Sequence, residues 1–106
     1  MTNFNKREMN EELLLFIKES TGAYDITISQ ETLIEDDLGV TGDDGVELIG
    51  KYSKQFNVDI SKFVFFEYFN DEPHAFSFNR KVKPLTVGDL EKGIVLGKLD
   101  ESVIAK

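Results

Sequence analysis

The sequence predicts a mainly α-helical protein, a four-helix bundle that forms one domain over residues 1–106. Three segments carry apolar side chains at the spacing of three to four residues that is typical of an amphipathic helix. Threonine stands in the N-cap position before two of them. A chain of this length buries roughly two thirds of the surface of its unfolded form, so one ordinary core is enough. We expect residues 1–7 and 101–106 to be frayed.

The first helix is predicted from about residue 10 to residue 20. Two glutamates in its first turn lie near the positive end of the helix dipole, and Gly22 follows its last turn. Its apolar face consists of Met9, Leu13, Phe16 and Ile17. Apolar and polar residues then alternate over residues 24–29, which predicts a short extended segment or a packed loop. The spacing of Thr32 and Glu35 is that of a capping box and predicts one short helical turn.

The second helix is predicted over residues 43–56, after the helix breaker Gly42. Thr41 is the expected N-cap, and acidic residues in the first turn and lysines in the last complement the helix dipole. Glu47 and Lys51 stand in the favourable i, i+4 order. The apolar stripe consists of Val46, Leu48, Ile49, Tyr52, Ser53 and Phe56.

The last two helices are less regular. Residues 60–69 fit neither a two-residue nor a 3.6-residue period, and we predict a short helix there that is opened by Asp59 or Ser61. Residues 74–83 are a loop or a strand, which leaves open a two-stranded element that pairs residues 26–28 with 76–82. The final helix is predicted from Thr86 to about Leu99. Its inward-facing residues are expected to be Val87, Leu90, Ile94 and Val95.

Aromatic residues are concentrated in one segment, because seven of the twelve lie between Phe63 and Phe78. They could line a pocket for an acyl chain or another apolar ligand. We favour a packed core, since a small domain has few other side chains large enough to fill its centre. Phe66, in the middle of the cluster, is therefore predicted to be a core residue whose replacement by alanine costs about 3–5 kcal/mol.

The chain carries 20 acidic and 12 basic side chains, a formal net charge of −8. Repulsion from phosphates makes nucleic acid and anionic membranes poor partners, whereas a basic protein surface is attracted. Residues 1–48 hold three basic and twelve acidic side chains, but residues 49–106 hold nine and eight. Seven acids fall within 17 consecutive residues, namely Glu31, Glu35, Asp36, Asp37, Asp43, Asp44 and Glu47.

Several classes of function are excluded or disfavoured. The chain has no cysteine, which excludes disulfides, thiol catalysis and zinc–thiolate sites. No apolar run approaches the roughly 20 residues of a membrane span, and the first residues lack the apolar stretch of a secretory signal. We therefore expect a cytoplasmic monomer.

No catalytic or metal site is predicted either. An EF-hand loop that begins at Asp37 fails, because its third position is Gly39 and its twelfth is Leu48 instead of glutamate. His74 has an aspartate and a serine nearby, but nothing indicates a nucleophile elbow or an oxyanion hole around it. We therefore do not expect an enzyme.

Residues 37–48, Asp-Leu-Gly-Val-Thr-Gly-Asp-Asp-Gly-Val-Glu-Leu, resemble the signature of the acyl carrier protein family. That signature reads Asp-Leu-Gly, two residues, serine, Leu, Asp, any residue and Val-Glu-Leu, and it aligns here without a gap. The matching positions are Asp37, Leu38, Gly39, Asp44, Val46, Glu47 and Leu48. The order of elements is similar over residues 8–70, and residues 84–99 resemble the final carrier helix. The resemblance is closest to bacterial carrier-like proteins of unknown function.

The attachment position departs from this family. Gly42 replaces the serine that carries phosphopantetheine, Thr41 replaces the preceding aspartate, and Asp43 replaces the following leucine. Glycine has no side-chain oxygen, so a phosphodiester to a prosthetic group cannot form there, and no cofactor is expected. Thr41 has a hydroxyl one residue away, but it is the expected N-cap. We expect the substitution Gly42→Ser to be tolerated, since serine is acceptable in a first helical turn.

The resemblance implies a protein-interaction module that docks basic partners, among them carrier-using enzymes, through the start of the second helix. The expected docking residues are Asp36, Asp37, Asp43, Asp44 and Glu47. Two alternatives stay open. One is a genuine acyl or peptidyl carrier with phosphopantetheine attached at an atypical residue such as Thr41, and the other is an acidic inhibitor or immunity-type protein that neutralises a basic partner.

Overall fold

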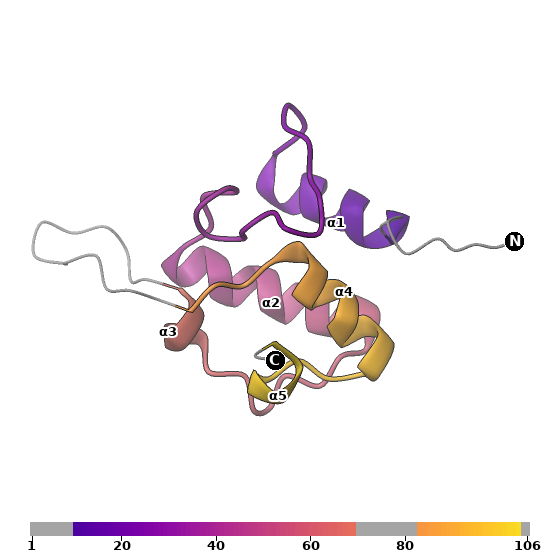
Figure 1. Cartoon of the computed structure of the whole chain (residues 1–106), viewed down its shortest axis with the longest axis vertical. Helices are drawn as coiled ribbons and strands as arrows, with labels where there is room; N and C mark the ends of the chain where they lie inside the picture. Colours follow the sequence, from indigo (N-terminus) through magenta and orange to yellow (C-terminus); the bar gives the residue numbers. More distant parts are fainter. Residues whose placement is uncertain (1–9, 70–82, 105–106) are drawn as a thin grey trace, which may run out of the picture.

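The structure is a computed structural model that describes residues 10–69 and 83–104. These residues contain five α-helices joined by loops (Figure 1). They are α1 (Glu11–Thr21), α2 (Gly42–Phe56), α3 (Phe65–Tyr68), α4 (Val87–Leu96) and α5 (Glu101–Ile104). The predicted mainly helical fold is confirmed, with one helix more than expected. None of the described helices has both the length and the apolar character needed to cross a membrane.

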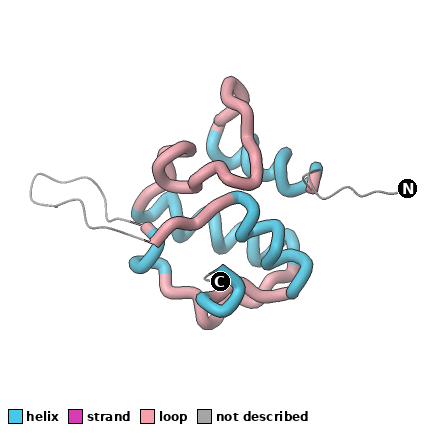
Figure 2. The backbone as a smooth tube through the Cα atoms, viewed as in Figure 1, coloured by secondary structure: helices cyan, strands magenta, loops and turns pink. Residues whose placement is uncertain are grey.

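Extended structure within the described ranges is limited to two isolated bridges, and Figure 2 shows helices and loops only. Leu33 pairs with Thr86, and Asp59 pairs with Lys98. Residues 26–28 belong to a loop. Their proposed partners, residues 76–82, lie outside the described residues.

The other helices pack around α2. The rings of Phe16 on α1 and Phe56 on α2 meet edge to face with 5.6 Å between their centroids, and the Tyr52 hydroxyl on α2 donates to the Leu90 carbonyl on α4. One cluster of buried side chains, to which α1, α2, α3, α4 and α5 all contribute, forms the core. The apolar side chains of all five helices thus share one hydrophobic core.

The bounds of α1 agree with the prediction. Asn10 is the N-cap, and its side chain accepts a hydrogen bond of 3.1 Å from the amide of Leu13. Gly22 ends the helix in the left-handed conformation, with φ of 76°, and its N–H donates to the carbonyl of Lys18.

The connection between α1 and α2 is a packed loop, and the capping box predicted at Thr32 does not form. The Thr32 hydroxyl accepts a hydrogen bond from the preceding Ser29 amide, at 2.8 Å, and so it does not cap a following helix. A hydrogen bond of 2.9 Å from the Ile34 amide to the Leu85 carbonyl joins the loop to the segment before α4. The turn itself is present over residues 34–38, with the Asp37 amide donating to the Leu33 carbonyl at 3.0 Å, but Thr32 does not cap it. The core residues of this connection are Ile28, Ile34 and Val40.

The short helix predicted within residues 60–69 is present as α3, but neither Asp59 nor Ser61 opens it. Asp59 instead accepts a hydrogen bond from the Ser61 amide, and its backbone pairs with residues 97–99 beyond α4. The helix begins after Val64.

The prediction that Phe66 is a core residue is wrong, because 63% of it is exposed. A helix of four residues can bury only one side, and that side is taken by Tyr68, which stacks on Phe63 with 5.1 Å between the ring centroids. Phe69 is buried as well. The aromatic cluster therefore forms core as predicted, but through its other members; Phe76 and Phe78 lie outside the described residues.

The C-terminal part differs from the prediction in two ways. Thr86 caps α4, as expected, and forms a capping box with Asp89. The helix ends at Leu96 because Gly97 adopts a φ of 81°. Val95 is 81% exposed instead of facing inward. Residues 101–104, expected to be frayed, form α5, which buries Val103 and Ile104 against the core.

Candidate partner-docking site

The first turn of α2 is built on the backbone of Thr41. Its carbonyl accepts hydrogen bonds from the amides of Asp44 and Gly45, at 2.9 and 3.2 Å. Thr41 occupies the predicted N-cap position, but its hydroxyl makes no capping hydrogen bond. The helix start is therefore set by backbone geometry and by the ring of Phe69, which lies so close to Gly45 that a Cβ there would come within 2.8 Å of it.

Gly42 is the first residue of α2, and its φ of 51° lies in the left-handed region that favours glycine. A residue with a Cβ is strained there by roughly 1–2 kcal/mol. The expectation that Gly42→Ser is tolerated is therefore wrong for this backbone. The chain lacks the serine hydroxyl and also the backbone conformation in which a serine would sit without strain.

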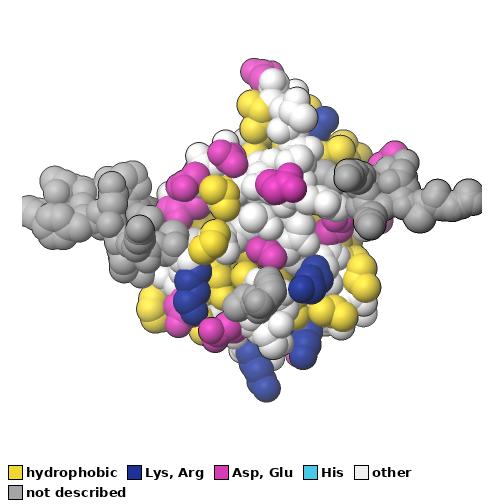
Figure 3. All heavy atoms as spheres, viewed as in Figure 1, with side chains coloured by type: hydrophobic (Ala, Val, Ile, Leu, Met, Phe, Trp, Pro, Cys, Tyr) yellow, Lys and Arg dark blue, Asp and Glu magenta, His cyan; other side chains and the backbone are white. Residues whose placement is uncertain are grey.

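The five predicted docking acids are all exposed, but they have different surroundings. The Asp37 carboxylate accepts a hydrogen bond of 2.8 Å from the Leu33 amide and so closes the turn before α2. Glu47 pairs with Lys51 at 3.6 Å, as the i, i+4 spacing predicted. Asp43 and Asp44 lie in the first turn of α2. On the face shown in Figure 3, acidic side chains gather mainly in the upper part and basic ones in the lower part.

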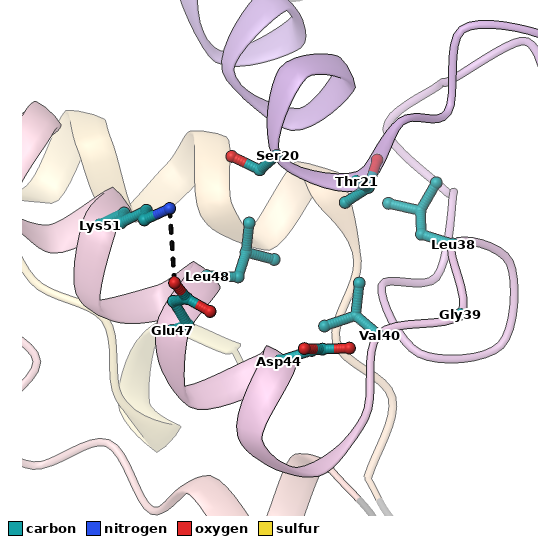
Figure 4. Close-up of a pocket in the computed structure, with 9 residues that line it drawn as sticks. All are labelled: Ser20, Thr21, Leu38, Gly39, Val40, Asp44, Glu47, Leu48 and Lys51. Carbon is teal, nitrogen blue, oxygen red and sulfur yellow. Dashed lines mark ion pairs between the residues drawn. The ribbon is translucent and has the colours of Figure 1, made fainter.

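Asp44 and Glu47 line a common cavity of about 180 Å³, which Asp36, Asp37 and Asp43 do not line. The cavity lies between the end of α1, residues 38–40 and the N-terminal half of α2 (Figure 4). Its lining residues are Ser20, Thr21, Leu38, Gly39, Val40, Asp44, Glu47, Leu48 and Lys51.

The cavity lies where the end of α1 faces the N-terminal half of α2. Glu12 near the start of α1 contacts Gln55 near the end of α2, with 3.5 Å between the carboxylate oxygen and the amide nitrogen, so the helices run antiparallel. Toward the start of α2 the cavity separates the two helices, and Leu48 points into it from below in Figure 4.

A shallower groove continues from the cavity along the same two helices. It has a volume of about 510 Å³ and shares Ser20 and Lys51 with the cavity. Its other lining residues are Phe16, Glu19, Lys54 and Gln55. Sequence reasoning missed this part of the site because its two walls are about 30 residues apart along the chain and no local pattern links them.

Shifted pKa values belong to groups that stabilise the fold. Burial raises the pKa of Tyr52 well above its usual range, and hydrogen bonds from Ser61 lower the pKa of Asp59. The hydrogen bond to Glu67 raises the pKa of Lys83. In the described ranges no three Asp, Glu or His side chains are placed to hold a metal ion. His74 lies outside those ranges.

Comparison with protein families gives one result. The model of the family described as "Protein of unknown function (DUF1493)" matches residues 6–104. Neither the curated proteins nor the solved structures contain a match. Because the family model covers nearly the whole chain, the protein belongs to the DUF1493 family.

Proposed function

We propose that this protein is an acyl-carrier-like interaction module that docks basic protein surfaces through the start of α2 and carries no phosphopantetheine. The proposal rests on two features that occur together at the start of α2. Asp44 and Glu47 are exposed beside an open cavity, and Gly42, at the carrier attachment position, has a left-handed backbone.

The resemblance to carrier proteins supports the docking role. Every matching position of the signature lies either in residues 37–39, at the end of the turn before α2, or in the first two turns of α2. Complementary charge at such a surface raises the rate of association and orients the encounter. Since Asp37 also stabilises its turn, Asp36, Asp43, Asp44 and Glu47 are the better candidates for contact with a partner.

The test uses wild-type protein and the double variant Asp43→Lys with Glu47→Lys as baits for proteins of its own cells. We expect wild type to retain a basic protein or a carrier-using enzyme at low salt and to lose it at 1 M salt, where the screening length falls to about 3 Å. The double variant should retain neither. Retention that is indifferent to salt and to charge reversal would contradict the proposal.

The rival function, a true carrier, is favoured by one observation, the Thr41 hydroxyl that makes no capping hydrogen bond. The intact mass of protein purified from its own cells decides between the two. A discrete addition of the phosphopantetheine mass that maps to Thr41 would establish the rival. The unmodified mass, kept after incubation with coenzyme A and a broad-specificity phosphopantetheinyl transferase, is the result that our proposal expects.

A further inference from the structure

We propose that the cavity between α1, residues 38–40 and α2 receives one lysine or arginine side chain of the partner protein. This inference rests on the proposed function and deepens it, because it names the group that the acidic surface recognises. Two observations support it: the size of the cavity, and a lining that combines apolar side chains with two carboxylates.

The size suits one long side chain. At about 180 Å³ the cavity is smaller than the roughly 300 Å³ at which pockets for small-molecule ligands begin. With about 30 Å³ for a water-sized group, it has room for about six non-hydrogen atoms. A lysine side chain, or the outer part of an arginine side chain, is of that size, whereas a long acyl chain or a nucleotide is larger.

The lining suits an alkyl stem that ends in a positive charge. Leu38, Val40 and Leu48 form an apolar wall along which the stem can lie, as the stems of basic residues commonly do. Asp44 and Glu47 stand three residues apart on the same helix face and offer two carboxylates to the cation. Lys51 also lines the cavity and lies 3.6 Å from Glu47, so the lining carries two acids and one lysine and keeps an excess of negative charge.

Other occupants fit less well. An anionic group would be repelled by the two carboxylates, and a second copy of this chain carries the same net charge of −8. A purely apolar ligand would shield Asp44 and Glu47 from water without offering either carboxylate a hydrogen bond, which is unfavourable. A basic side chain satisfies both the apolar wall and the acidic rim.

The experiment titrates ¹⁵N-labelled full-length protein with N-acetyl-arginine amide at low ionic strength and follows the amide chemical shifts. N-acetyl-norleucine amide serves as the uncharged comparison of similar stem length. We expect arginine binding with a Kd on the order of 1 mM, which is reasonable for a single side chain. The shifts should be confined to residues 20–21 and 38–51, and the norleucine compound should bind at least about fivefold more weakly.

Three variants locate the site. Asp44→Asn with Glu47→Gln should weaken arginine binding at least about fivefold, whereas Glu11→Gln with Asp25→Asn removes the same charge from exposed acids outside the cavity and should leave it within about twofold. Ser20→Phe, which fills the cavity from the last turn of α1 without changing any acid, should abolish binding. The spectrum of each unliganded variant shows whether its fold is retained.

Each contrary outcome is informative. Equal binding of arginine and norleucine would identify an apolar site, and equal effects of the two acid pairs would identify diffuse attraction; either overturns the inference. If arginine does not bind but the charge-reversed bait still loses its partner, docking stands and the cavity is not its recognition site. If wild-type bait shows no salt-sensitive partner, the proposed function fails independently of the arginine result.

Discussion

The hydroxyl of Tyr52 on α2 donates a hydrogen bond of 2.7 Å to the carbonyl oxygen of Leu90 on α4, and both residues are fully buried. Gly93, one turn further along α4, makes room for this contact, because a Cβ there would collide with the same hydroxyl. The two helices are thereby held at short distance by one polar group within the apolar core.

Tyr52→Phe should lower the free energy of unfolding by about 1–2 kcal/mol at pH 7, because the hydrogen bond to the buried carbonyl is lost. Urea denaturation followed by circular dichroism measures this difference. Tyr24→Phe is the matched control, since Tyr24 is 59% exposed and its replacement should leave stability unchanged. Equal effects of the two substitutions would show that the buried bond contributes nothing net.

The same tyrosine makes stability depend on alkaline pH. Burial raises its folded-state pKa above the value of about 10 that it has when unfolded, so its contribution is complete below pH 10. Above pH 10 the unfolded chain loses this proton while the folded one keeps it, and stability falls as pH rises toward the folded pKa. Wild type and Tyr52→Phe should therefore converge in stability between pH 10 and 11. A constant difference over that range would contradict the assignment.

Gly45→Ala should destabilise the protein by about 1–3 kcal/mol, since the new Cβ would approach the Phe69 ring to 2.8 Å. In a Phe69→Ala background the same change should be neutral or slightly stabilising, because the ring is gone and alanine favours helix. A double-mutant cycle measured by thermal unfolding gives this coupling. Additive effects would mean that ring and helix do not touch.

Gly42 and Gly50, both on α2, should respond oppositely to alanine. Gly42→Ala forces a side chain into a backbone with φ of 51° and should cost about 1–2 kcal/mol. A Cβ on Gly50 would meet no atom within 4 Å outside its own helix, so Gly50→Ala should stabilise by about 0.5–1 kcal/mol. Chemical denaturation of the two variants tests the pair, and stabilisation by Gly42→Ala would refute the left-handed helix start.

Phe63→Ala should lower the free energy of unfolding by about 3–5 kcal/mol, because Phe63 is buried, with only 6% of it exposed, and its ring stacks on Tyr68. Phe66→Ala should cost about 1 kcal/mol or less, since most of Phe66 faces outward. Melting temperatures of the two variants compare them directly. A larger loss for Phe66 would mean that its ring is part of the core after all.

The sequence by itself determined those features whose hydrogen bonds or periodicity lie within a few residues. Gly22 ends α1, Thr86 caps α4, and Glu47 pairs with Lys51, all as predicted. Each of these depends on groups no more than four residues apart, so the local pattern is sufficient. The acidic first half of the chain is likewise a property of composition alone.

Only the tertiary structure decided which side of an element is buried and what lies opposite it. Phe63 and Phe66 belong to the same aromatic segment, yet packing buries Phe63, which precedes α3, and leaves Phe66 exposed, because α3 turns the side that carries Tyr68 toward the core. The cavity joins Ser20 to Asp44 and Lys51, and the Ile34 amide on the loop between α1 and α2 donates to the Leu85 carbonyl before α4. Such contacts link residues that are distant along the chain, and their geometry is set by how the whole core packs.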